Sequence, residues 1–117
     1  MRLPQILRSK AEREAQLRSS LDSIADQLKA MGALRIVLFG SLAKGEVDVR
    51  SDLDLLVIMP SAKSGKEWSR LVYDNVERGV DSDIIVYNQD EFAEMIRASS
   101  FLTVVMESGK VIYEKTP

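Results

Sequence analysis

Aspartates occur in pairs at two points of the chain, each directly before an apolar run. Asp52 and Asp54 precede LLVIM, and Asp81 and Asp83 precede IIVY. On an extended strand, residues two apart point to the same face and lie about 6.6 Å apart at Cα. Carboxylates placed in this way can share divalent cations spaced about 3.5–4 Å apart. The alternative for the first pair is an exposed edge strand with solvated acids, but unpaired acids entering a core are costly and favour a bound cation.

A glycine–serine pair is the second chemical feature. Gly40 and Ser41 directly follow the apolar segment LRIVLF. Glycine allows a sharp turn and a close approach of the backbone to a ligand. The backbone N–H groups and the Ser41 hydroxyl can bind a phosphate, especially if a short helix begins here. Such a pair is more often an ordinary turn, so its meaning depends on the nearby aspartates. If neighbouring strands bring three carboxylates to this turn, the set suits metal-assisted phosphoryl transfer.

The composition restricts the chemistry further. The chain contains no cysteine and no histidine, which excludes disulfides, thiolate nucleophiles, zinc sites built from these residues and an imidazole base. Carboxylate oxygens favour Mg²⁺ or Mn²⁺ over softer metals. A net charge of −2 argues against nucleic acid as the main partner. No stretch approaches the roughly 18 apolar residues of a membrane span, so we expect a soluble cytoplasmic protein.

The elements that must position these residues can be read from the apolar pattern. A chain of 117 residues, 45% of them hydrophobic, fits one packed domain. We expect strands at residues 34–39, 53–59, 83–87 and 110–113, with helices at residues 4–30, 66–77 and, whole or broken, 92–106. Asn88 and Glu91 resemble a capping box. Only a loop joins the first two strands, which permits antiparallel pairing. The predicted class is α/β or α+β, a mixed sheet of about four strands with helices packed on one face.

The first helix divides into two parts by composition. Its apolar stripe consists of Leu17, Leu21, Ile24 and Leu28, whereas residues 8–16 are far more polar. We therefore separate an N-terminal helical extension, residues 1–16, from the domain proper, residues 17–117. The extension is interpreted as a solvated helix, with a partner-binding or dimer-forming arm as the alternative.

The segment GSLAKGEVDVRSDLDLLVI resembles the signature of the DNA polymerase β-like nucleotidyltransferase superfamily. The spacing of a Gly-Ser pair, ten residues and Asp-x-Asp is met by Gly40, Ser41, Asp52 and Asp54. The resemblance is strongest to the minimal nucleotidyltransferases of bacteria and archaea, and it covers roughly residues 17–114. It implies the polymerase β-like fold.

The resemblance also implies a role for each matching acid. Asp52 and Asp54 would bind two Mg²⁺ ions. A third carboxylate would ligate one metal and help to deprotonate the acceptor hydroxyl. Asp83 is assigned to this role because it directly precedes the apolar strand, and Asp81 is the alternative.

Nucleotide-binding roles follow from the same resemblance. Gly40 and Ser41 would hold the triphosphate of the nucleotide. Lys44 occupies a position that is often basic in the family and would touch phosphate, although a solvated loop lysine is an equally good interpretation.

The activity implied is transfer of AMP from ATP to a hydroxyl. Small members resembling this chain are commonly encoded beside a helical HEPN-type protein, where they resemble the antitoxin half of a toxin–antitoxin pair and adenylylate the toxin. Two alternatives remain: adenylylation of a small molecule such as an aminoglycoside, for which a homodimer could supply further walls, and a non-catalytic subunit that binds a partner.

Overall fold

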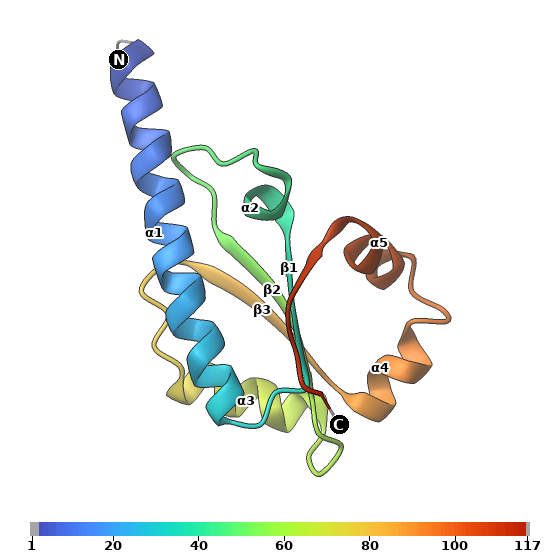
Figure 1. The fold of residues 1–117 in the computed structure, drawn as a ribbon. Coiled ribbons are helices and arrows are strands. Elements are labelled where there is room, and N and C mark those ends of the chain that lie inside the picture. The colour runs from blue at the N-terminus through green and yellow to red at the C-terminus, as the bar shows by residue number, and fades with distance from the viewer. Residues whose placement is uncertain (1–2, 117) are drawn as a thin grey trace.

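A single four-stranded sheet with helices on both of its faces forms the protein (Figure 1). The computed structural model describes residues 3–116. The elements in chain order are α1 (Leu3–Ala30), β1 (Arg35–Phe39), α2 (Gly40–Lys44), β2 (Leu53–Met59), α3 (Gly65–Asn75), β3 (Ser82–Asn88), α4 (Gln89–Met95), α5 (Ser100–Ser108) and β4 (Lys110–Glu114). The predicted strands and helices therefore all form. The segment at residues 92–106, expected as one helix or two, lies in the two helices α4 and α5.

The sheet has the strand order β3-β2-β1-β4. β1 pairs antiparallel with both β2 and β4, whereas β2 and β3 run parallel. The predicted mixed sheet and the antiparallel pairing of the first two strands are confirmed. Because β2 and β3 are parallel and in register, both begin at the same end of the sheet, which is also the end where β1 stops.

One face of the sheet packs against α1 and α3. The predicted stripe of Leu17, Leu21, Ile24 and Leu28 is buried there, together with Trp68 and Val72 of α3. The sheet contributes alternate residues of β1 and β2, among them Ile36, Leu55 and Val57. This face holds the larger part of the core, and the buried stripe of α1 belongs to it.

The opposite face is covered by α4 and α5. Val37 and Leu56 of the central strands are buried with Leu102 and Val105 of α5. The prediction that helices pack on one face is wrong in this detail. The cause lies in β2, which is a continuous apolar run after Asp54 and therefore buries both of its faces, so that each face needs a cover.

Local signals account for several boundaries. The capping box at α4 is present, since Asn88 Oδ1 accepts from the Glu91 N–H at 2.8 Å and Glu91 Oε1 accepts from the Asn88 N–H at 2.9 Å. Helix α1 is continuous from Leu3 to Ala30, and its N-terminal part projects beyond the sheet (Figure 1). Its first buried residue is Leu17. Within residues 3–116 we find no helix with the length and apolarity needed to cross a membrane.

Candidate active site

The acids predicted to do chemistry lie at the end of the sheet where β2 and β3 begin. Asp54 and Asp83 are each the second residue of their strand and are register partners in the parallel pair. Partners on adjacent strands lie about 4.8 Å apart and point to the same face. Asp81 lies just before β3, where its carbonyl accepts a hydrogen bond from the Leu53 N–H at 3.1 Å. The register therefore places Asp83, rather than Asp81, directly beside Asp54.

The environment of Asp54 disfavours its negative charge. Burial raises the pKa of the Asp54 carboxyl above its ordinary value, and the charges of Asp83 and then Asp52 raise this pKa further. Burial acts by desolvating the charge and the two neighbouring carboxylates act by repulsion, so all three causes favour the protonated form of Asp54. A divalent cation between them would reverse the effect, so the arrangement has the electrostatics of a cation site.

The predicted glycine turn lies against this carboxylate. β1 ends at Phe39, and α2 begins at Gly40, whose φ is +76°. A Cβ at this position would collide with the Asp54 carboxylate, so the close approach requires glycine. Phe39 is the register partner of Asp54, which fixes the turn beside the acid. The short helix expected after this strand is present, and the Gly-Ser pair and the aspartates meet.

The remaining nucleotide-binding candidates lie on α2. Ser41 is partly buried in its first turn, and Lys44 is exposed in its last. Gly45 ends the helix with a left-handed φ of +72°. The position of Lys44 is compatible with contact to a phosphate, and this role stays a prediction.

Asp52 precedes β2 and points to a partner that sequence reasoning missed. Its Oδ1 lies 3.6 Å from Nη2 of Arg13, and Nε of Arg13 donates to the Ser51 carbonyl at 2.8 Å. Arg13 belongs to the segment interpreted as a solvated extension, yet its side chain is only 20% exposed. One signal could have found it: Arg13 lies four residues before Leu17, on the helix face that carries the buried stripe.

The oxygen donors fit a hard cation, although the side chains do not yet enclose one. Among residues 3–116 no three acidic side chains are close enough to form a metal-binding set. Asp54 and Asp83 form an adjacent pair, whereas Asp52 is drawn toward Arg13. The oxygen donors, the shared end of the sheet and the raised pKa of Asp54 are compatible with a hard divalent cation, and Mg²⁺ held by Asp52, Asp54 and Asp83 stays a prediction.

An aromatic pair borders the acids. The rings of Phe39 and Phe101 lie 6.0 Å apart and are nearly perpendicular, at 82°. Phe101 is about half exposed, which is uncommon for such a large apolar side chain. Since Phe39 is the register partner of Asp54, this ring pair connects the end of β1 beside the acid to α5. Sequence reasoning assigned no role to either ring.

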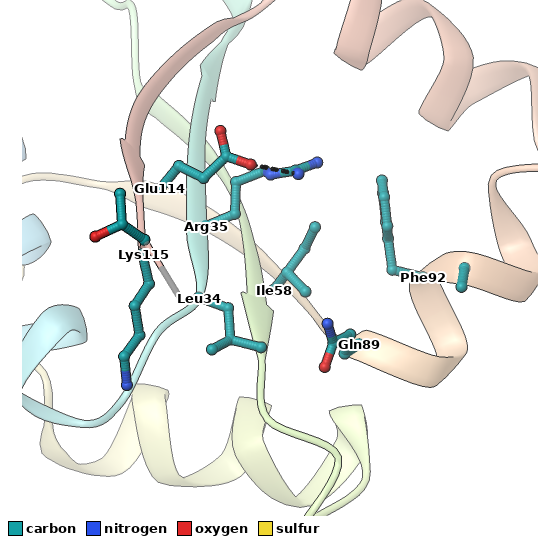
Figure 2. Close-up of a pocket in the computed structure, with 9 residues that line it drawn as sticks. Leu34, Arg35, Ile58, Gln89, Phe92, Glu114 and Lys115 are labelled. Carbon is teal, nitrogen blue, oxygen red and sulfur yellow. Dashed lines mark hydrogen bonds and ion pairs between the residues drawn. The ribbon is translucent and has the colours of Figure 1, made fainter.

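A cavity of about 600 Å³ lies elsewhere, toward the other end of the sheet. Figure 2 shows Leu34, Ile58 and Phe92 around it, with the ion pair between Arg35 and Glu114 at 2.6 Å along its edge. Ile58 is four residues along β2 from Asp54, about 13 Å at strand spacing. The cavity is therefore separate from the acids and does not belong to the candidate active site.

Comparison with known proteins agrees with this geometry. The family model described as "Nucleotidyltransferase domain" matches residues 21–112. The fold is similar to a crystal structure from Sulfolobus solfataricus described as a "putative nucleotidyltransferase", with a TM-score of 0.65 and 16% identity over 92% of this chain and 88% of that chain. No curated protein matches the sequence. The chain therefore belongs to the nucleotidyltransferase domain family, with an α+β fold consistent with the polymerase β-like class.

Proposed function

We propose that the protein transfers AMP from ATP to a hydroxyl group, with Mg²⁺ held by Asp52, Asp54 and Asp83. The observation that carries this proposal is the in-register pair of Asp54 and Asp83 against the Gly40 turn. Two strand starts and one helix start supply the acids and the phosphate-binding backbone at a single end of the sheet. Burial and then the charges of Asp83 and Asp52 raise the pKa of Asp54, and perturbed pKa values of this kind are common at functional sites.

Different residues serve triphosphate binding and proton transfer. Gly40 and Ser41 bind the triphosphate through the backbone and the hydroxyl. Bound divalent cations would supply charge neutralisation for the phosphates. Asp83 accepts the proton of the acceptor hydroxyl. The acceptor oxygen then forms a bond to the α-phosphorus while the bond to pyrophosphate breaks, so that AMP is transferred and pyrophosphate leaves.

A protein acceptor is the best supported choice. Asp54 and Asp83 lie at the end of the sheet where β2 and β3 begin, outside the lining of the 600 Å³ cavity. A small molecule usually needs more enclosing walls than this end provides. A helical HEPN-type protein encoded nearby, as in toxin–antitoxin pairs, is the acceptor we propose.

Transfer of label from [α-³²P]ATP tests the proposal. The purified protein is incubated with Mg²⁺ and the helical protein encoded beside it, and radioactivity on the partner is measured after denaturing electrophoresis. We expect labelling that needs Mg²⁺ and is lost in Asp54→Ala. A tight complex without label would indicate a binding subunit instead, and label on an added aminoglycoside would indicate the small-molecule reaction.

A further inference from the structure

Arg13 links the projecting part of α1 to the segment that carries Asp52. Its Nε donates to the Ser51 carbonyl at 2.8 Å, and its Nη2 lies 3.6 Å from Asp52 Oδ1. The two residues that it contacts are 38 and 39 positions away in the sequence. A guanidinium can hold a carbonyl and a carboxylate together because its donors have a fixed planar geometry.

The segment that Arg13 holds lies just outside the sheet. Ser51 and Asp52 precede β2, whose first residue is Leu53. The loop before them is ordered by its own contacts: the Asp48 N–H donates to Ser51 Oγ at 2.9 Å, and the Arg50 N–H donates to Asp48 Oδ1 at 2.8 Å. These bonds lie within the loop, so they shape it without attaching it to the rest of the domain.

The two contacts of Arg13 differ in strength. The bond to the carbonyl is short, and the Arg13 side chain is only 20% exposed. The carboxylate contact exceeds hydrogen-bond distance, and the Asp52 side chain is 54% exposed. Asp52 can therefore turn away to bind a cation while the bond to Ser51 stays in place.

We propose that Arg13 is a positioning residue for the cation site: it anchors the Ser51 carbonyl so that Asp52 stays within reach of Asp54. The proposal rests on the nucleotidyltransferase function proposed above. When no cation is bound, the positive charge of Arg13 also offsets the repulsion between Asp52 and the other two acids, Asp54 and Asp83. Losing the anchor lets the end of the loop move, and the Asp52 carboxylate moves with it.

The test compares Arg13→Ala with Arg18→Ala, a matched control on the same helix. Arg18 forms an exposed ion pair with Glu14 at 3.0 Å, and within residues 3–116 we find no hydrogen bond or ion pair between Arg18 and the loop. Two measurements need no acceptor: hydrogen exchange of the amides at residues 48–52, and the affinity for Mn²⁺ from electron paramagnetic resonance. The rate of AMP transfer is the third measurement.

We expect Arg13→Ala to speed loop exchange and to weaken Mn²⁺ binding by about tenfold, as for other residues that orient metal ligands. The value of kcat should fall by a similar factor, with a smaller change in KM for ATP. Arg18→Ala should match the wild type. Arg13→Lys keeps the charge but not the planar donors, so we expect it to restore Mn²⁺ binding only in part.

Loop exchange and Mn²⁺ affinity that are equal in Arg13→Ala and Arg18→Ala would overturn the proposal. So would faster exchange with unchanged Mn²⁺ affinity, because the anchor would then be structural only. Should Arg13→Ala fail to fold, Arg13→Lys decides by the same criteria. If the wild type binds Mn²⁺ but labels no acceptor, the transfer function fails, while the exchange and Mn²⁺ measurements still decide the role of Arg13.

Discussion

Gly40 is constrained twice at the level of the single residue. Its φ of +76° disfavours any side chain, and the space that a Cβ would need is taken by the Asp54 carboxylate. Gly45 has a similar φ of +72°, but a Cβ there would meet nothing within 4 Å. The two glycines therefore separate the backbone requirement from the requirement for space beside the acid.

Replacing each glycine by alanine measures these two requirements. Gly45→Ala should cost about 1–2 kcal/mol of unfolding free energy through the left-handed backbone alone, with transfer retained. Gly40→Ala should cost about 2–4 kcal/mol and lower kcat/KM about 100-fold, because Asp54 must also move. Chemical denaturation and initial rates provide the comparison. Equal effects of the two substitutions would contradict the contact between Gly40 and Asp54.

Asp54 is predicted to make the cation-free protein less stable as the pH rises. The folded chain holds the Asp54 proton more tightly than the unfolded chain, since the pKa of Asp54 is raised above 3.8. Its contribution to stability is therefore present in acid and is lost as the pH rises from the ordinary value through the raised one. Because asparagine has no titrating carboxyl, Asp54→Asn removes this loss of stability at higher pH.

Thermal unfolding in a chelator checks the direction. At neutral pH we expect Asp54→Asn to have a Tm above the wild type, by no more than a few degrees because partial exposure screens the charge. The difference should shrink in acid. Mg²⁺ should then raise the Tm of the wild type and not that of Asp54→Asn. A lower Tm for the variant at neutral pH would show that Asp54 stabilises the fold.

At the level of the elements, strand register favours Asp83 over Asp81 as the third carboxylate. Because Asp83 faces Asp54 across the β2–β3 pair, Asp83→Asn should lower the transfer rate by about 100-fold or more. Asp81→Asn should change it less than about fivefold, since a residue outside the strands is less constrained toward the acids. Steady-state rates of both variants, with circular dichroism as a check of folding, test this assignment. The opposite ranking would show that Asp81 fills the role.

Sequence predicted what depends on local pattern and missed what depends on distant contacts. The β2 strand was predictable because LLVIM is bounded by Asp54 and Pro60, and the α4 cap because Asn88 and Glu91 are three residues apart. The pairing of Asp54 with Asp83 needed the register of two strands joined through α3, which no local signal contains. Arg13 was missed for the same reason: its partner lies 38 residues away. The helices of residues 92–106 were predicted, but their position on the second face was not, because an apolar run does not say what will cover it.

At the scale of the whole molecule, α1 already contacts the rest of the domain at a residue that precedes its first buried side chain. Leu17 begins the buried stripe, but Arg13 already contacts the segment before β2. Leu3 and Leu7 are exposed in the projecting part. The predicted division between residues 16 and 17 can thus be tested by truncation.

Removal of residues 1–10 should leave the Tm within about 2 °C of the full chain, since surface changes usually cost about 0.5 kcal/mol or less. Removal of residues 1–16 also deletes Arg13 and should lower both Mn²⁺ affinity and transfer about tenfold. Calorimetry and the label assay compare the two. If removal of residues 1–10 abolished folding, the predicted division between residues 16 and 17 would be wrong.

Alternate residues of β2 face opposite sides of the sheet, and only the side that faces α4 and α5 carries an acid. Leu53, Leu55 and Val57 face α1 and α3, while Asp54 faces the opposite side. Inserting or deleting a single residue within it would exchange the two sides beyond that point, turning a carboxylate toward the leucines or a leucine toward the candidate active site. Evolution can therefore vary which side chains occupy Leu53–Met59 but has almost no freedom to alter its length, so insertions that diversify such a protein must fall in the surrounding connections.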